Sequence, residues 1–183
     1  MAFQPADGSR MDPAYLTDRI LTNSVTWTVG EAVRSYTTGF AVKAAASEPI
    51  LGIIVGFKNN DGSLIAPSAN TKSTTAYTTS IESVTSASDN ETVAKVKAVI
   101  CCDVSSRWSA ACNGTIGTTT ASNLPGGKID VDSSNTDYGR VLESTNTRTP
   151  GTDANFYNWG TDPSDSTRLI VSIAESELFS ESS

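Results

Sequence analysis

The stretch Pro49-Ile50-Leu51-Gly52-Ile53-Ile54-Val55-Gly56-Phe57 decides the fold class of this chain. Its apolar residues are largely β-branched, and such side chains fit a pleated strand better than a helix. The longest dense apolar run of the chain, Ile50 to Phe57, has eight residues and is far too short for a membrane-spanning helix. Its two glycines indicate a bulge or a close backbone approach. The stretch therefore predicts a central β-strand.

Period-two patterns on both sides of this stretch predict further strands. Val25, Trp27 and Val29 alternate with threonines, which is the pattern of a half-buried strand. The tetrapeptide at 59–62, Asn-Asn-Asp-Gly, is a strong turn signal. We expect other strands at residues 32–36, 40–42, 64–66, 93–104, 128–132, 139–143 and 167–173. Short strands separated by turns indicate an all-β fold, an antiparallel β-barrel or β-sandwich.

Residues 1–23 lack a core-forming pattern, and we expect them to form an extended N-terminal arm. Asp12-Pro13 is a helix-start signal, because an N-cap acceptor precedes a proline at the first helical position. A short helix is therefore expected over residues 13–21, with Leu16 and Ile20 on one face. We expect this face to take part in an interface.

The β-rich domain, residues 24–183, is expected to fold without the arm. It should carry long loops at 67–91 and 145–166, and a Ser/Ala-rich turn around Trp108. Three aromatic residues occur in the second loop, Phe156, Tyr157 and Trp159. Such loop aromatics either fold back onto the core or anchor an interface, and both interpretations stay open.

The predicted core is made of inward-facing residues of these strands. Its members are Val25, Trp27, Ile53, Val55, Val96, Ile100, Leu169 and Val171. Trp27, Trp108 and Trp159 could instead form an aromatic platform for sugars. Because Trp27 alternates with threonines along a strand, a core position is favoured for it.

Composition supports the same fold class and excludes some partners. The 183 residues include 25 Ser and 24 Thr. Threonine suits strands, serine suits turns, and neither favours a helix interior. The net charge is −7 and the basic residues are scattered, so we expect neither nucleic acid nor an anionic membrane as a partner. Residues 1–10 lack the apolar region of a signal peptide.

Catalysis is not expected. The chain has no histidine, which removes the commonest general base and the usual metal ligand. Neither a phosphate-binding loop nor a GxGxxG or GxSxG motif occurs. Two carboxylates can suffice for glycoside hydrolysis, but the acidic residues lie in turns and in the acidic tail, residues 175–183. We expect no catalytic residue and no cofactor.

Four carboxylate or amide side chains lie in residues 130–139, namely Asp130, Asp132, Asn135 and Asp137. Calcium uses such ligands, but an EF-hand loop would need a glycine at its sixth position, and none is present. In the simpler interpretation, Asp130 and Asp132 form the solvent face of a strand and the other two form its turn. No metal site is assigned.

The chain has three cysteines, Cys101, Cys102 and Cys112. Their number is odd, and two of them are adjacent in sequence. This is a poor basis for a disulfide framework, and three thiols without histidine rarely complete a zinc shell. We expect reduced thiols that pack as small apolar groups. A bridge from Cys101 or Cys102 to Cys112 is the alternative.

Several segments together resemble one family. Val29-Gly30-Glu31-Ala32-Val33 and the stretch from Glu48 through Phe57 resemble capsid decoration (head cement) proteins of tailed bacteriophages. Those proteins often carry a GD.V strand, a small-residue linker and a PILGVVVG-like strand. Gly139-Arg140-Val141-Leu142 fits their penultimate strand, and residues 168–173 are similar to their closing strand. The resemblance touches about half of the chain and leaves out the arm and residues 67–91.

The resemblance implies a structural virion protein that caps the outer capsid surface. The implied partner is the major capsid protein, and the implied assembly is a homotrimer at three-fold or quasi-three-fold positions. The protein would be made in the host cytoplasm, and it would stabilise the capsid by binding the assembled state only. The alternative is a carbohydrate- or receptor-binding β module of a phage tail or fibre, and a minor tail or neck subunit is a third interpretation.

Overall fold

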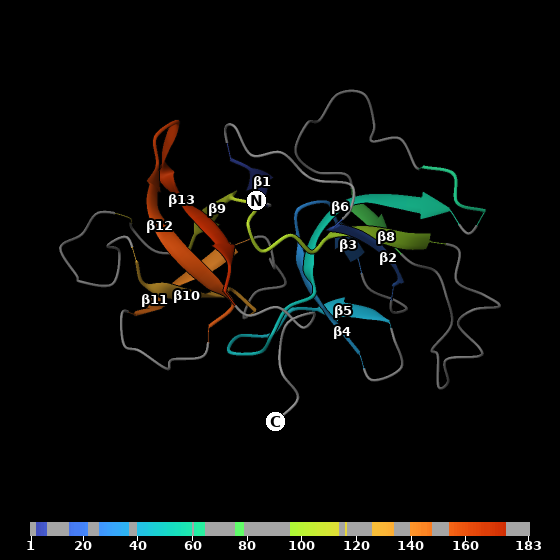
Figure 1. The fold of residues 1–183 in the computed structure, drawn as a ribbon, viewed down its shortest axis with the longest axis horizontal. Coiled ribbons are helices and arrows are strands. Elements are labelled where there is room, and N and C mark those ends of the chain that lie inside the picture. The colour runs from blue at the N-terminus through green and yellow to red at the C-terminus, as the bar shows by residue number, and fades with distance from the viewer. Residues whose placement is uncertain are drawn as a thin grey trace.

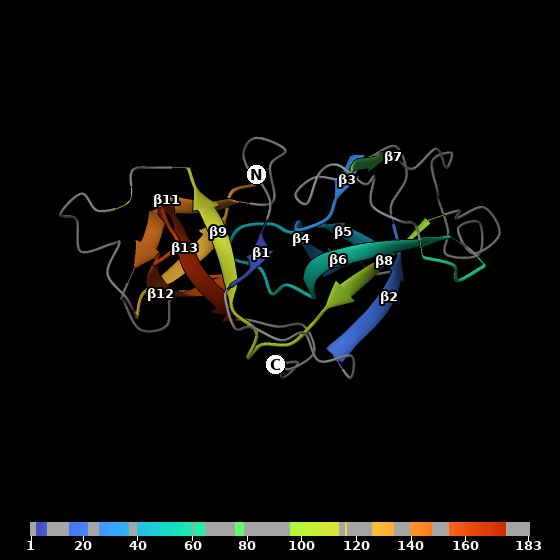
Figure 2. The ribbon, with the colours of Figure 1, turned by 90° about the horizontal axis from the view of Figure 1, so that it is seen from above.

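A computed structural model describes the following parts of the chain: residues 3–6, 15–21, 26–36, 40–59, 61–64, 76–78, 96–113, 116, 126–133, 140–147 and 154–174. These parts are built from β-strands and contain no α-helix, which confirms the all-β fold class. Within these ranges no helix has the length and hydropathy of a membrane span. Figures 1 and 2 show two lobes lying side by side.

The first lobe is an antiparallel sheet in the order β2-β8-β6-β4-β5. Its strands are β2 (Leu16–Ile20), β4 (Ala32–Ser35), β5 (Ala41–Lys43), β6 (Gly52–Asn59) and β8 (Val96–Cys101). A parallel bridge between Leu21 and Ala41 joins the two edges of this sheet, so the sheet curls into a small barrel. Two further strands, β3 (Thr26–Thr28) and β7 (Ala76–Thr78), pair with each other in a separate antiparallel sheet. In sequence, both lie between β2 and β8 of the first lobe.

The second lobe is a closed barrel. Its strands are β1 (Gln4–Pro5), β9 (Trp108–Cys112), β10 (Lys128–Val131), β11 (Arg140–Thr147), β12 (Phe156–Asp162) and β13 (Asp165–Ile173). The order is β1-β9-β11-β10-β12-β13, and β9 also pairs with β13, which closes the ring. The pairing of β11 with β9 is parallel, whereas β12 and β13 form an antiparallel hairpin.

The apolar stretch that contains Gly52 and Gly56 forms the centre of the first lobe, as predicted. β6 pairs with β4 on one side and with β8 on the other. Its register against β8 shifts between Ile54 and Gly56, which is the expected bulge. A side chain at Gly52 would overlap the carbonyl group of Cys101 in β8, so this glycine permits a close backbone approach.

Two clusters of buried apolar side chains form the core. One fills the first lobe and includes Trp27, Phe57 and Ile100. The other fills the second lobe and continues into the first through Ile50 and Ile53. The lobes therefore share apolar packing and are not independent units.

Most of the predicted core residues are buried. Trp27, Ile53, Ile100, Leu169 and Val171 have almost no exposed surface. Val55 is half-buried and packs against the shared cluster. The structure does not describe the side chains of Val25 and Val96.

The short helix expected over residues 13–21 is a wrong prediction, because Leu16–Ile20 is strand β2. A spacing of four places Leu16 and Ile20 on one face of a helix, but also on one face of a strand. β2 pairs residue by residue with β8, from Leu16 opposite Cys101 to Ile20 opposite Lys97. This pairing satisfies the backbone groups along that edge of β8, which an isolated helical turn would leave open.

The arm is extended as expected, but its described parts are built into both lobes. Phe3 is buried, its backbone N–H donates to the carbonyl of Gly30 at 2.8 Å, and β1 pairs with β9. Leu21 is buried in the first lobe. Removal of the arm would thus take two edge strands, β1 and β2, and two core side chains from the fold. The expectation that the β-rich domain folds without the arm stays a prediction, and these contacts argue against it.

The long loop expected at 145–166 is also wrong. β11 extends to Thr147, and β12 with its turn into β13 occupies most of the rest of this range. Trp108 is not in a turn, because it begins β9 and is buried. The loop expected at 67–91 lies outside the described residues, apart from β7.

Candidate binding surface

β12 alternates strictly between buried and exposed residues. The inward residues are Phe156, Asn158, Gly160 and Asp162. Tyr157 and Trp159 point outward, and 41% and 48% of their surfaces are exposed. Of the three aromatic residues predicted near an interface, Phe156 is therefore a core residue. Its ring centroid lies 4.9 Å from that of Phe3.

A cationic side chain stands beside each exposed ring. The Arg107 guanidinium lies 4.3 Å from the centroid of the Trp159 ring. The Lys128 ammonium group lies 5.7 Å from the centroid of Tyr157. The indole N–H of Trp159 donates to Ser172 Oγ at 2.8 Å, which fixes the ring on the outside of the barrel. We call Tyr157, Trp159, Arg107 and Lys128 the β12 surface.

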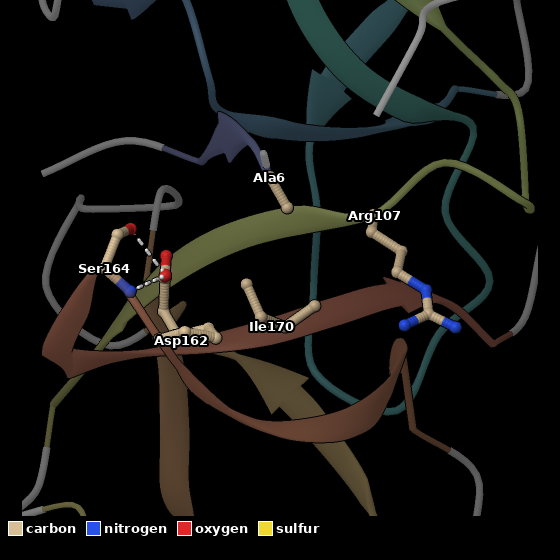
Figure 3. A pocket seen from close by; sticks show the side chains of 6 residues that line it. Ala6, Arg107, Asp162, Ser164 and Ile170 are labelled. Atoms are coloured by element: carbon tan, nitrogen blue, oxygen red, sulfur yellow. Dashed lines mark hydrogen bonds between the residues drawn. The ribbon is translucent and has the colours of Figure 1, made fainter. Parts of the chain in front are cut away.

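A pocket of about 400 Å³ adjoins the β12 surface through Arg107. Its lining residues are Ala6, Arg107, Asp162, Pro163, Ser164 and Ile170. Figure 3 shows Ile170 between Arg107 on one side and Asp162 with Ser164 on the other. The backbone N–H of Ala6 donates to the carbonyl of Arg107 at 2.9 Å, which ties the N-terminal segment to the pocket wall.

Asp162 holds the turn between β12 and β13. Its Oδ1 accepts hydrogen bonds from the backbone N–H and the hydroxyl of Ser164, at 2.8 and 2.7 Å, and its Oδ2 accepts one from Ser109. Burial raises the pKa of Asp162, but the bonds from Ser109 and Ser164 and the charge of Arg168 outweigh it. The pKa therefore lies below its ordinary value.

Ser109 has a structural role beside this acid. It is buried, and its hydroxyl donates to Asp162 while it accepts from Arg168 Nε at 2.8 Å. The Arg168 guanidinium also donates to the backbone carbonyl of Ser109 at 2.6 Å. A nucleophilic serine needs a neighbouring group that can take its proton, and a carboxylate is one such group. Here, however, the hydroxyl of Ser109 is buried, and its hydrogen bonds join β9 to β13.

Asp130 and Asp132 are not on a solvent face, so the simpler interpretation of this segment is wrong. Both are buried. Asp130 accepts hydrogen bonds from the backbone N–H of Ser47 at 2.8 Å, from its hydroxyl at 3.1 Å and from the backbone N–H of Asn155 at 3.2 Å. Asp132 lies 3.4 Å from the Arg140 guanidinium.

Asn155 completes this polar link between the lobes. Its side-chain amide donates to the carbonyls of Ala45 and Glu48 in the linker between β5 and β6. Its side-chain oxygen accepts from the backbone N–H of Val131 at 2.8 Å. The linker contains Ser47 with φ 58°, a left-handed conformation that these bonds hold in place. Asp130 and Asn155 thus fasten the first lobe to the second.

The two remaining carboxylate or amide side chains of this segment, Asn135 and Asp137, are not described by the structure. No group of three or more acidic or thiol side chains gathers in the described ranges. Cys101 and Cys102 are buried thiols and Cys112 is a half-buried one, as the reduced interpretation predicted. The pKa of the Cys101 thiol is raised, mainly because the thiol is buried.

Leu16 and Ile20 lie away from the β12 surface, on β2 of the first lobe. Leu16 is 38% exposed and Ile20 is half-buried. The structure therefore does not bring the two predicted interface groups into one patch. Arg107 and Lys128 were not expected at this surface from the sequence. Their aromatic partners are distant in sequence, and no local pattern joins the cations to the rings.

Comparison with protein-family models, with curated proteins and with solved structures finds no match to this chain.

Proposed function

We propose that this protein is a structural virion protein, a decoration protein that binds the outer surface of a tailed-phage capsid and stabilises it. The observation that carries the proposal is the β12 surface. Tyr157 and Trp159 are 41% and 48% exposed on a strand inside a hydrogen-bonded barrel, and tyrosine and tryptophan are enriched at protein interfaces. Because the strand is rigid, binding costs little conformational entropy.

The family resemblance adds support from separate parts of the chain. The segments that carry it contribute to β4, β6, β11 and β13. Both lobes are therefore represented. The partner that the resemblance implies is the major capsid protein, and we extend the proposal to a homotrimer at three-fold positions. Cyclic symmetry would cover the same patch on every copy.

The copy number in purified virions tests the proposal. Native mass analysis should find hundreds of copies per particle for a capsid decoration protein. A few to a few dozen copies would contradict it and indicate a tail or neck protein.

Substitution of the exposed rings tests the surface itself. The double variant Tyr157→Ala with Trp159→Ala should lower capsid occupancy at limiting protein concentration about tenfold or more. Tyr36→Ala is the matched control, because Tyr36 is also exposed but lies in the first lobe. Equal occupancy by both variants would exclude the β12 surface as the contact.

One observation favours the alternative, a carbohydrate-binding module of a tail or fibre. Two exposed aromatic rings beside a pocket with polar groups are typical of sugar sites as well as of protein interfaces. A glycan array with the intact protein separates the two. Specific glycan binding together with a low copy number would favour the module.

A further inference from the structure

β2 is the outer strand of the first sheet, with β8 between it and β6 (Figure 2). The backbone N–H of Cys102 donates to the carbonyl of Tyr15 at 2.9 Å, and the antiparallel register continues from there along β8. In such a pair, residues bonded to the partner strand alternate with residues whose backbone groups point away from it. Because Tyr15 is bonded to β8, the backbone groups of Leu16, Asp18 and Ile20 point to the open side of β2.

The described part of the chain leaves this side of β2 open along most of its length. The bridge between Leu21 and Ala41 closes the sheet just beyond the C-terminal end of β2, and no other described strand pairs with this side. Among the described residues, the outward backbone N–H groups of Leu16, Asp18 and Ile20 have no hydrogen-bond partner. An edge of this kind is a template on which an extended segment of another chain can pair.

Arg19 lies at this open edge. Its Nη1 donates to the carbonyl of Asp18 at 3.1 Å and to Thr17 Oγ1 at 3.0 Å. Since the Asp18 carbonyl points to the open side, the first bond holds the guanidinium beside the edge. The carbonyl oxygen keeps a second lone pair for the N–H of an added strand. In the part of the chain that the structure describes, the other donors of Arg19 make no bond and no carboxylate pairs with it.

Asp18 disfavours a second copy of this chain as the added strand. Outward residues must meet outward residues, so the two-fold antiparallel register that pairs all of β2 places Asp18 opposite Asp18 of the other copy. Like charges directly opposite each other destabilise a pair of strands. The Asp18 carboxylate already has a cation in its own chain, since Lys58 Nζ lies 2.9 Å away. Arg19 is therefore the charge that a different protein can satisfy, with an acidic side chain.

We propose that β2 binds an extended segment of another protein as an added antiparallel strand, with an acidic side chain opposite Arg19. By the same alternation, Arg19 forms a non-hydrogen-bonded pair with the added strand, and opposite side chains are closest in such pairs. Apolar residues of the segment would lie opposite Leu16, which is 38% exposed, and opposite Ile20. The inference goes beyond the proposed function, because β2 belongs to the first lobe and the β12 surface to the second.

A peptide titration of the full-length, isotope-labelled protein tests strand addition. The probe is N-acetyl-Thr-Val-Glu-Thr-Thr-Val-Thr-amide, whose glutamate lies opposite Arg19 when its valines lie opposite Leu16 and Ile20. The matched control peptide has glutamine in place of the glutamate. Near saturation with the probe, nuclear magnetic resonance should show that amide exchange with water slows about fivefold or more at Leu16, Asp18 and Ile20. The probe should bind about threefold more tightly than the control peptide, as expected for one cross-strand ion pair. Unchanged exchange at these three amides, or equal binding of both peptides, would overturn the inference.

Two substitutions at Asp18 separate the backbone from the charge. Asp18→Pro removes an outward N–H, and proline is tolerated on an edge strand where the N–H faces solvent. Asp18→Asn is the matched control, because it loses the same charge and keeps the N–H. We expect Asp18→Pro to bind the probe about tenfold more weakly than Asp18→Asn. Equal binding by the two folded variants would contradict strand addition.

Arg19→Gln tests the charge and does not depend on the folding of the proline variant. It should bind the probe and the control peptide equally well, because the threefold preference comes from the guanidinium. Circular dichroism should show that each variant is folded. A preference for the acidic peptide that persists in Arg19→Gln would overturn the placement of the acidic side chain opposite Arg19.

Discussion

Gly52 of β6 lies close to the backbone of β8, and a methyl group there would collide with the Cys101 carbonyl. Because the obstructing atoms belong to the backbone, Gly52→Ala must displace a strand. We expect the free energy of unfolding to fall by about 1–3 kcal/mol, as for other overpacked sites. Gly56→Ala is the control, since no atom lies within 4 Å of its missing Cβ. Urea unfolding compares the two, and equal losses would show that the close approach is misplaced.

Aspartates followed two residues later by a hydroxyl residue form a recurring local unit. Asp61, Asp103, Asp162 and Asp165 each accept hydrogen bonds from the backbone N–H and the hydroxyl of that residue. The sequence signature Asp-x-Ser/Thr is short and common, so only the structure shows which copies are formed. At each of these four sites the pKa of the aspartate is lowered.

These shifts predict loss of stability in acid. A carboxyl group whose folded pKa lies below its unfolded value, about 3.9, stabilises the fold above that value. The contribution is lost as the pH falls through the lower, folded pKa. We expect the free energy of unfolding to be level above about pH 5 and to fall below about pH 4. Asp162→Asn should reduce this slope, and an unchanged slope in urea titrations at several pH values would contradict the role of Asp162.

At the scale of elements, the central strand was predictable and β12 was not. The stretch around Gly52 and Gly56 has one dominant signal, continuous β-branched residues, and it forms a strand with the expected bulge. β12 inverts the usual pattern, because Asn158 and Asp162 face inward while Trp159 faces outward. A period-two pattern of hydrophobicity does not reveal such a strand, because polar residues occupy its inward positions and Asp162 is satisfied in part by Ser109, which is distant in sequence.

The link between the lobes was also hidden from sequence reasoning, because Asn155 makes its hydrogen bonds to residues distant in sequence. Its side chain joins three backbone groups that lie 24 or more residues away in sequence. Asn155→Asp would keep the shape but place an oxygen against the carbonyls of Ala45 and Glu48. We expect the free energy of unfolding to fall by about 2–4 kcal/mol. Thermal unfolding at pH 7 measures this, with Asn59→Asp at the end of β6 as a control of equal charge change.

For the whole molecule, the shared core predicts that the two lobes unfold together. Ile50 and Ile53 of the first lobe pack in the same cluster as Leu169 and Ile129 of the second. Phe3 crosses between the lobes, and Asn155 fastens the linker. We expect a single calorimetric transition whose enthalpy equals its van't Hoff enthalpy. Two separate transitions would show that the lobes are independent.

The function proposed here places the molecule on a capsid, with the β12 surface at a contact. A density map of phage heads by electron cryo-microscopy tests that claim most directly. We expect trimers of two-lobed density at three-fold or quasi-three-fold positions, with Tyr157 and Trp159 at an interface. Isolated monomers at capsomer centres, or no density for this protein on the head, would contradict it.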